Sequence, residues 1–169
     1  ILEARSPEIA TRFSGALDVV ELGSGSGEKT RTLLAAFERK GDHARELRYV
    51  PIDVSRSALI ENSERMLGEF ANLSITAVEA SYAEGLSLLG PSEVPRLVLW
   101  LGSSVGNFDR AAAGAFLAEL RTHMAPGDRL LIGIDLRKDP AVLEAAYDDA
   151  AGVTAVSYTH LRAHETATY

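Results

Sequence analysis

The sequence contains no cysteine, so neither disulfide bonds nor thiolate zinc ligands are available. It also has no apolar run as long as a membrane-spanning helix. Basic residues are the smaller charged group, because 17 Lys and Arg stand against 24 Asp and Glu for a net charge of −7. That balance argues against a nucleic-acid backbone or an anionic membrane surface as the main partner. We therefore expect a cytoplasmic protein that binds a small molecule, with no obligate protein partner.

The end of the chain lacks the apolar periodicity of the rest. The stretch VSYTHLRAHET, residues 156–166, is typical of read-through translation of a sequencing-library adapter. We therefore expect one domain over residues 1–155, truncated at both ends, followed by a non-native tail over residues 156–169. Two of the four histidines, His160 and His164, fall in that tail, and we expect no metal site.

Short β-rich runs alternate with longer helical patterns along the chain. Runs such as RLVLWL and RLLIGI are apolar at consecutive positions, as expected for strands with both faces covered by helices. This order predicts an α/β protein of Rossmann-like type, with an open, mostly parallel sheet and helices on both faces. Ser6 and Pro7 are expected to cap and begin the first helix. The expected strands are residues 17–22, 49–53, 73–78, 97–101 and 129–135, and the expected helices are residues 8–13, 29–40, 56–70, 83–89, 109–124 and 140–150.

The most distinctive segment is VVELGSGSGEKT, residues 19–30, which follows the first expected strand. A dinucleotide fingerprint, Gly-x-Gly-x-x-Gly counted from Gly23, fails because its third glycine falls on Glu28. A P-loop fails at the same residue, since a carboxylate there would repel phosphate and remove a flexible glycine. A degenerate P-loop of a nucleotide-binding or NTPase module nevertheless stays open as an alternative.

A third interpretation has no defect, because an acid followed by Gly-x-Gly-x-Gly is the loop pattern of S-adenosylmethionine (SAM) methyltransferases of class I. Here the acid is Glu21 and the glycines are Gly23, Gly25 and Gly27. Glycines let the backbone approach the methionine part of the cofactor, and a carboxylate is favourable beside its sulfonium cation. Asp53 ends the second expected strand, at the carboxyl edge where ligands of such sheets bind, and is placed to accept hydrogen bonds from the ribose.

Longer phrases extend this interpretation. The stretches ELGSGSGEKTRTLL, YVPIDVSRSAL, LWLGSSVGNF, LLIGIDLRKDP and AAYDDAAGVTA occur in matching order over residues 1–155. Together they resemble the histidine-specific Nα-methyltransferases of ergothioneine biosynthesis. The resemblance implies methyl transfer from SAM to the α-amino nitrogen of L-histidine, giving trimethylhistidine (hercynine).

The resemblance also implies roles for single residues on the cofactor side. Gly23 and Lys29 would line the cofactor loop, with Lys29 pairing the methionyl carboxylate, and Asp53 would hold the ribose. Ser81 and Tyr82 match the pair that the family places beside adenine. Many members have Asp-Phe at that pair, so Ser81 would offer the adenine amino group a weaker, neutral acceptor.

On the substrate side, Asn107 and Tyr147 match residues that hold the carboxylate of histidine. No residue is assigned as a general base, and Asp135, Lys138 and Asp139 are given no chemical role. The family has an upstream helical segment and a second domain that grips the imidazole, so acceptor specificity is expected to depend on parts outside this core. Another amino acid or small amine therefore stays open as the methyl acceptor.

Overall fold

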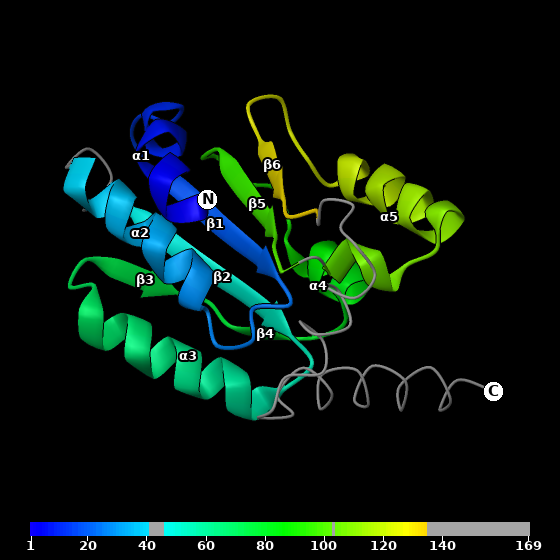
Figure 1. The fold of residues 1–169 in the computed structure, drawn as a ribbon, viewed down its shortest axis with the longest axis horizontal. Helices are drawn as coiled ribbons and strands as arrows, with labels where there is room; N and C mark the ends of the chain where they lie inside the picture. The colour runs from blue at the N-terminus through cyan, green and yellow to red at the C-terminus, as the bar shows by residue number, and fades with distance from the viewer. Residues whose placement is uncertain (41–45, 103, 135–169) are drawn as a thin grey trace, which may run out of the picture. The chain divides into compact units, whose positions relative to one another are not determined.

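The computed structural model describes residues 1–40, 46–102 and 104–134. Within these ranges helices and strands alternate as the sequence predicts (Figure 1). In chain order the elements are α1 (Leu2–Thr11), β1 (Leu17–Leu22), α2 (Glu28–Lys40), β2 (Leu47–Asp53), α3 (Arg56–Glu69), β3 (Leu73–Ile75), β4 (Val78–Glu79), α4 (Tyr82–Leu88), β5 (Arg96–Trp100), the 3-10 helix η1 (Ser104–Asn107), α5 (Arg110–Thr122) and β6 (Arg129–Ile132).

The described strands form one sheet in the order β3-β2-β1-β5-β6, with β4 also paired to β2. All of its pairings are parallel. The chain moves outward from β1 to β2 and β3, then returns to place β5 on the other side of β1 (Figure 1). The strand order therefore reverses between β1 and β5, which is where ligands bind in sheets of this kind. The expected α/β fold is confirmed.

The two faces of the sheet bury alternate residues of the same strands. Leu17 and Val19 of β1 pack into one hydrophobic cluster, whereas Val20 and Leu22 pack into the other. Because successive side chains of a strand point to opposite faces, consecutive apolar residues require helices on both faces. The first cluster receives buried side chains from α1, α2 and α3 (Ala10, Leu33, Leu34, Phe37, Met66), and the second receives them from α4 and α5 (Leu86, Phe116, Leu120).

The first helix differs from the expectation. It begins at Leu2, so Ser6 lies inside α1 and does not cap it, and Pro7 is an interior residue. The Ser6 hydroxyl donates a hydrogen bond to the Leu2 carbonyl at 2.7 Å. Both Ser6 and Ala10, one turn apart, are buried, so packing of this helix face outweighs the cost of an interior proline.

The strand expected over residues 73–78 is interrupted. It forms β3 and β4, which both pair with β2, and at the break the Thr76 N–H still donates to the Tyr49 carbonyl at 3.0 Å. The last expected strand ends at Ile132, three residues before its expected end, and the other predicted elements within the described residues begin and end within two residues of their expected bounds. The helix expected over residues 140–150 lies outside the described residues, as does residue 135 at the end of the last expected strand.

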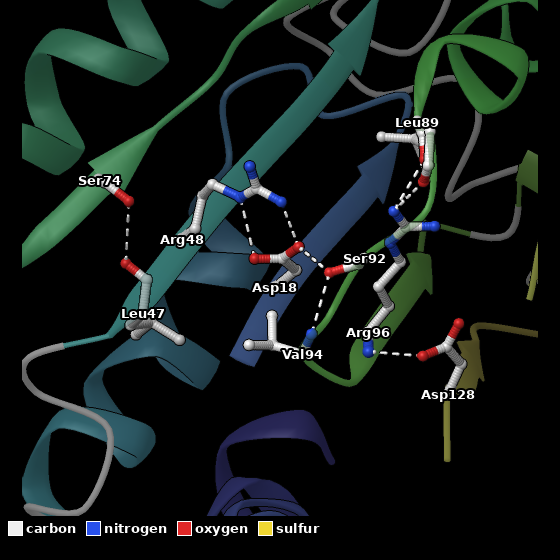
Figure 2. Close-up of polar contacts among 10 residues, drawn as sticks. Asp18, Leu47, Arg48, Ser74, Leu89, Ser92, Val94, Arg96 and Asp128 are labelled. Carbon is white, nitrogen blue, oxygen red and sulfur yellow. Dashed lines mark hydrogen bonds and ion pairs between the residues drawn. The ribbon is translucent and has the colours of Figure 1, made fainter. Parts of the chain in front are cut away.

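A polar cluster joins the amino ends of the central strands, opposite the edge where ligands bind (Figure 2). The Asp18 carboxylate is buried and accepts hydrogen bonds from Arg48 Nε at 2.9 Å, from Arg48 Nη2 and from the Ser92 hydroxyl at 3.1 Å. The Arg96 backbone N–H donates to Asp128 Oδ1 at 2.8 Å. These bonds connect β1 with β2 and β5 with the turn before β6, so we assign the cluster to stability.

Candidate active site

The loop between β1 and α2 is held in a conformation that needs glycine. Gly23, Gly25 and Gly27 have φ of 71°, 46° and 69°, in the left-handed region that other residues adopt at a cost. Gly23 N donates to the Ile52 carbonyl at 2.9 Å, and Gly27 N donates to the Ser24 carbonyl at 2.8 Å. The loop is therefore bound both to the end of β2 and to itself.

The three glycines face different surroundings. A Cβ on Gly23 would lie 2.6 Å from the Tyr82 hydroxyl oxygen, and a Cβ on Gly27 would overlap the side chain of Asn62. A Cβ on Gly25 would meet no described atom within 4 Å. Protein side chains therefore close the loop at Gly23 and Gly27, whereas Gly25 leaves the backbone open to a ligand. That opening fits a cofactor whose atoms approach the main chain.

Asp53 lies beside this opening, at the carboxyl end of β2. Its Oδ2 accepts a hydrogen bond from Gly25 N at 2.8 Å, and its Oδ1 accepts one from Ser55 N at 2.9 Å. Ser55 in turn caps α3, because its hydroxyl accepts from Ala58 N at 3.4 Å. Asp53 thus orders the turn into α3 and the glycine loop together. Each carboxylate oxygen keeps a second lone pair that a ligand hydroxyl could use.

Glu21 does not line the loop opening. It is 3% exposed and accepts a hydrogen bond from the Tyr49 hydroxyl, which itself accepts one from Asn62 Nδ2 at 3.0 Å. Burial raises the pKa of Glu21 to about 7, against the hydrogen bond from Tyr49, the neighbouring Thr30 side chain and the nearby positive charge of Lys29. Sequence reasoning missed Tyr49 and Asn62, since neither belongs to a motif and only the fold brings them to Glu21.

Lys29 reaches from the first turn of α2 to the end of β5. Its Nζ lies 3.1 Å from the position that a Cβ on Gly102 would occupy. Gly102 follows β5 and also has a left-handed φ of 77°. Lys29 therefore places its cation at the point where the strand order reverses, beside the two neighbouring strand ends. A carboxylate of a small molecule bound there would meet a positive charge.

Ser81 and Tyr82 begin α4, at the end of β4. The Ser81 hydroxyl donates to the Glu84 carboxylate at 2.6 Å and accepts from Glu84 N at 3.4 Å, so it is engaged in a capping box. The Tyr82 ring packs against Trp100 and Phe116, with ring centroids 6.2 and 6.0 Å apart. Burial raises the pKa of Tyr82, and the negative charge of Asp53 raises it further. Tyr82 is therefore next to both Gly23 and Asp53.

The residues expected on the substrate side are only partly described. Asn107 is the exposed last residue of η1, which follows β5. Tyr147 lies outside the described residues, as do Asp135, Lys138 and Asp139. Within the described residues no group of three or more His, Cys, Asp and Glu side chains is arranged to hold a metal ion. None of the helices there is long and apolar enough to cross a membrane.

Glu28, the residue that breaks both nucleotide-binding patterns, is tied to α3. Its carboxylate lies 2.7 Å from Arg65 Nη1 and 3.7 Å from Arg31 Nε. Arg65 also donates a hydrogen bond to the Ser26 carbonyl, inside the loop. Glu28 therefore helps to fasten the loop to α3, and a carboxylate in this place does not suit a phosphate site.

Comparisons with known proteins identify the family. A sequence model of the family described as histidine-specific, SAM-dependent methyltransferases matches residues 1–164. The histidine N-alpha-methyltransferase of Mycobacterium tuberculosis is 43% identical over 92% of this chain and 47% of its own length. The ergothioneine biosynthesis protein 1 of Neurospora crassa is 32% identical over 91% of this chain and 18% of its own length. The chain thus spans about half the length of the first relative and about a fifth of the length of the second.

The fold is shared with solved methyltransferase structures. The O-methyltransferase TomG from Streptomyces achromogenes, solved in complex with SAM, superposes with a TM-score of 0.54 at 16% identity. The superposition covers 95% of this chain and 66% of that protein. At this level of identity the likeness supports the fold alone.

Proposed function

The chain belongs to the histidine-specific, SAM-dependent methyltransferases, and from this premise we propose that it is the cofactor-binding core of an enzyme that methylates L-histidine. The reaction would place methyl groups on the α-amino nitrogen and give trimethylhistidine, the first step of ergothioneine biosynthesis. The observation that carries the proposal is the hydrogen bond from Gly25 to Asp53, which sets an open glycine backbone beside a carboxylate at the carboxyl edge of the sheet. A cytoplasmic location is part of the same proposal.

On the cofactor side, the glycine loop, Asp53 and Lys29 would each contact a different part of SAM. Gly25 would let the cofactor approach the loop, Gly23 would line the same loop where Tyr82 packs against it, and Asp53 would accept hydrogen bonds from the ribose hydroxyls of the cofactor. Lys29 would pair with the carboxylate of the cofactor, because its ammonium group lies beside Gly102, which follows β5. Bound SAM would supply the methyl group, carried on a sulfonium centre that withdraws electrons from it.

Ser81 and Tyr82 would border the adenine at the pair where many members of the family have Asp-Phe. Since Ser81 donates its proton to Glu84, its oxygen has one remaining lone pair for the adenine amino group. Tyr82 would supply an apolar ring edge, fixed by Trp100 and Phe116. We therefore propose that adenine recognition by this chain depends more on packing than on a charged acceptor.

On the substrate side, Asn107 and Tyr147 would hold the histidine carboxylate through an amide N–H and a phenol O–H. Their task would be to orient the α-amine, since methyl transfer depends on nucleophile, methyl carbon and sulfur lying in a line. The amine must lose its proton before it attacks, and no described residue is assigned to remove it. An acceptor other than histidine is the second candidate, and it is separated from the first by the assay below.

The nucleotide-binding alternative is weakened by Glu28, whose carboxylate pairs with Arg65 and lies at the position a P-loop gives to glycine. Calorimetric titration of the full chain with S-adenosylhomocysteine and with magnesium-ATP separates the two functions. We expect saturable binding of the homocysteine compound and none of ATP. Binding of ATP that strengthens in the Glu28→Gly variant would overturn the methyltransferase assignment.

The acceptor is tested by mass spectrometry after incubation of an enzyme that contains this core with SAM and single amino acids. Histidine is expected to gain one, two and three methyl groups, and L-tryptophan and L-lysine serve as controls. Methylation of another amino acid in preference to histidine would contradict the proposed acceptor while leaving the cofactor assignment intact.

A further inference from the structure

A buried chain of polar groups lies behind the glycine loop, outside the residues that would touch the cofactor. Asn62 of α3 donates to the Tyr49 hydroxyl at 3.0 Å, and Tyr49 of β2 donates to the Glu21 carboxylate of β1. Asn62 and Tyr49 are 0% exposed and Glu21 is 3% exposed. The three elements around the loop, α3, β2 and β1, are therefore joined by hydrogen bonds between buried side chains.

This hydrogen-bonded chain of Asn62, Tyr49 and Glu21 also touches the glycine loop. A Cβ on Gly27 would overlap the Asn62 amide, so Asn62 occupies the space that the glycine leaves. Gly27 has a φ of 69°, and its N–H is already bonded to the Ser24 carbonyl. The conformation of the loop is thus set partly by the position of the Asn62 amide, and the Tyr49 hydroxyl fixes that amide.

Glu21 is the charged member of this hydrogen-bonded chain of side chains. Groups from two elements, β2 and α2, face its carboxylate. From β2 it meets Tyr49 and the negative charge of Asp53, and from α2 it meets Thr30 and the positive charge of Lys29. Burial raises its pKa to about 7, so its ionisation is finely balanced and depends on the hydrogen bonds that it accepts. A donor to a carboxylate favours the ionised form, and Tyr49 is such a donor.

We propose that Tyr49 is a positioning residue of the cofactor site: held by Asn62, it orients the Glu21 carboxylate behind the glycine loop and favours its charged form, which in turn favours a positively charged ligand. The inference rests on the proposed function, because S-adenosylhomocysteine and SAM both carry an α-ammonium group. Tyr49 itself touches no ligand in this account and acts through Glu21.

The test is a calorimetric series on the full chain with S-adenosylhomocysteine as the ligand. Tyr49→Phe keeps the buried ring and removes only the hydroxyl, and it is expected to weaken binding at pH 7 by roughly tenfold, as for loss of a hydrogen bond to a charged group. In the Glu21→Gln background the same change is expected to weaken binding by about twofold at most. An equal loss in both backgrounds, or no loss in a folded Tyr49→Phe variant, would overturn the proposal.

The pH dependence separates this role from simple loosening of the loop. Without its donor, Glu21 stays protonated to higher pH, so the loss in Tyr49→Phe should shrink as the pH is raised from 7 towards 9. Asn62→Leu should show a smaller loss with the same trend, because Tyr49 keeps its bond to Glu21. Arg65→Gln is the matched control, since Arg65 holds the same loop from the same helix through Ser26 and Glu28 without touching Glu21.

For Arg65→Gln any loss of affinity should be constant over this pH range. A loss in Tyr49→Phe that is equally constant would contradict the proposal and leave a packing role. If the unmodified chain binds S-adenosylhomocysteine and only the Tyr49 predictions fail, the proposed function stands. If the unmodified chain does not bind it, the proposed function fails and takes the Tyr49 role with it.

Discussion

The backbone N–H of Gly25 lies 2.8 Å from Asp53 Oδ2 and donates a hydrogen bond to it. This bond joins residues 28 positions apart, the loop after β1 and the end of β2, at the carboxyl edge of a parallel sheet. It places the two parts of a cofactor site, an open backbone and a hydrogen-bond acceptor, in direct contact.

The first prediction concerns the open glycine. Gly25→Ala adds a Cβ that meets no described atom within 4 Å, so the unfolding free energy should fall only by about 1 kcal/mol through backbone strain at positive φ. Affinity for S-adenosylhomocysteine should fall far more, because the Cβ projects into the space proposed for the ligand. Gly114→Ala, also in open space but inside α5, is the control and should leave affinity unchanged. Equal affinity in both variants would mean that the ligand does not approach Gly25.

Lys29 gives the second prediction. Lys29→Met keeps the aliphatic stem and removes the cation near Gly102, so affinity for S-adenosylhomocysteine should fall by roughly tenfold through loss of a charge-assisted contact. Arg31→Met, two residues further along α2, removes exposed ion pairs with Glu28 and Glu69 and should change affinity little. Titration of both variants decides the matter, and a larger loss in Arg31→Met would contradict the role of Lys29.

Glu21 makes the stability of the fold depend on pH. Its pKa is about 7 in the folded protein against 4.5 for an ordinary glutamate side chain, so the folded state binds the extra proton between these values. Stability from this residue is therefore greatest below pH 4.5 and is lost as the pH rises towards 7, by about 3 kcal/mol in all. Denaturant unfolding at pH 5, 6, 7 and 8 should show this slope, and Glu21→Gln should flatten it. If the stability of Glu21→Gln has the same slope with pH as that of the unmodified chain, the pH dependence comes from other groups.

The polar cluster at the amino ends of the strands should affect stability alone. Arg48→Met leaves the buried Asp18 carboxylate without its ion-pair partner and is expected to cost about 1–3 kcal/mol of unfolding free energy, a value reduced because Arg48 is half exposed. Affinity for S-adenosylhomocysteine should remain within about twofold, since the cluster lies at the other edge of the sheet. A selective loss of affinity with normal stability would contradict this division.

The sequence predicts much of this arrangement because its signals are local. Consecutive apolar residues in the strands require two covering layers, and the glycine loop and Asp53 follow their strands directly, so their meeting at one edge follows from the parallel order. The extension of α1 through Pro7 was not predictable, since it depends on burial of Ser6 and Ala10 against the rest of the fold.

The parts of the site that sequence reasoning missed share one physical cause. Tyr49 and Asn62 reach Glu21 only through packing of α3 on the sheet, and nothing in their local sequence indicates a polar contact. Likewise, the sequence shows Glu28 only as a mismatch to the nucleotide-binding patterns, because its partner Arg65 comes from α3 and is brought near by the fold. Contacts between elements distant in the chain carry no periodicity, and motifs alone therefore leave them out.

The most direct test of a cofactor site at the Gly25–Asp53 contact is a comparison of two aspartates with the same local bonding. Asp53 accepts from the backbone N–H groups of Gly25 and Ser55, and Asp128 accepts from those of Arg96 and Ala125 at the opposite edge. Calorimetric titration with S-adenosylhomocysteine is predicted to show a loss of more than tenfold in Asp53→Ala and unchanged affinity in Asp128→Ala. Equal affinity in the two variants, both shown to be folded, would contradict the account.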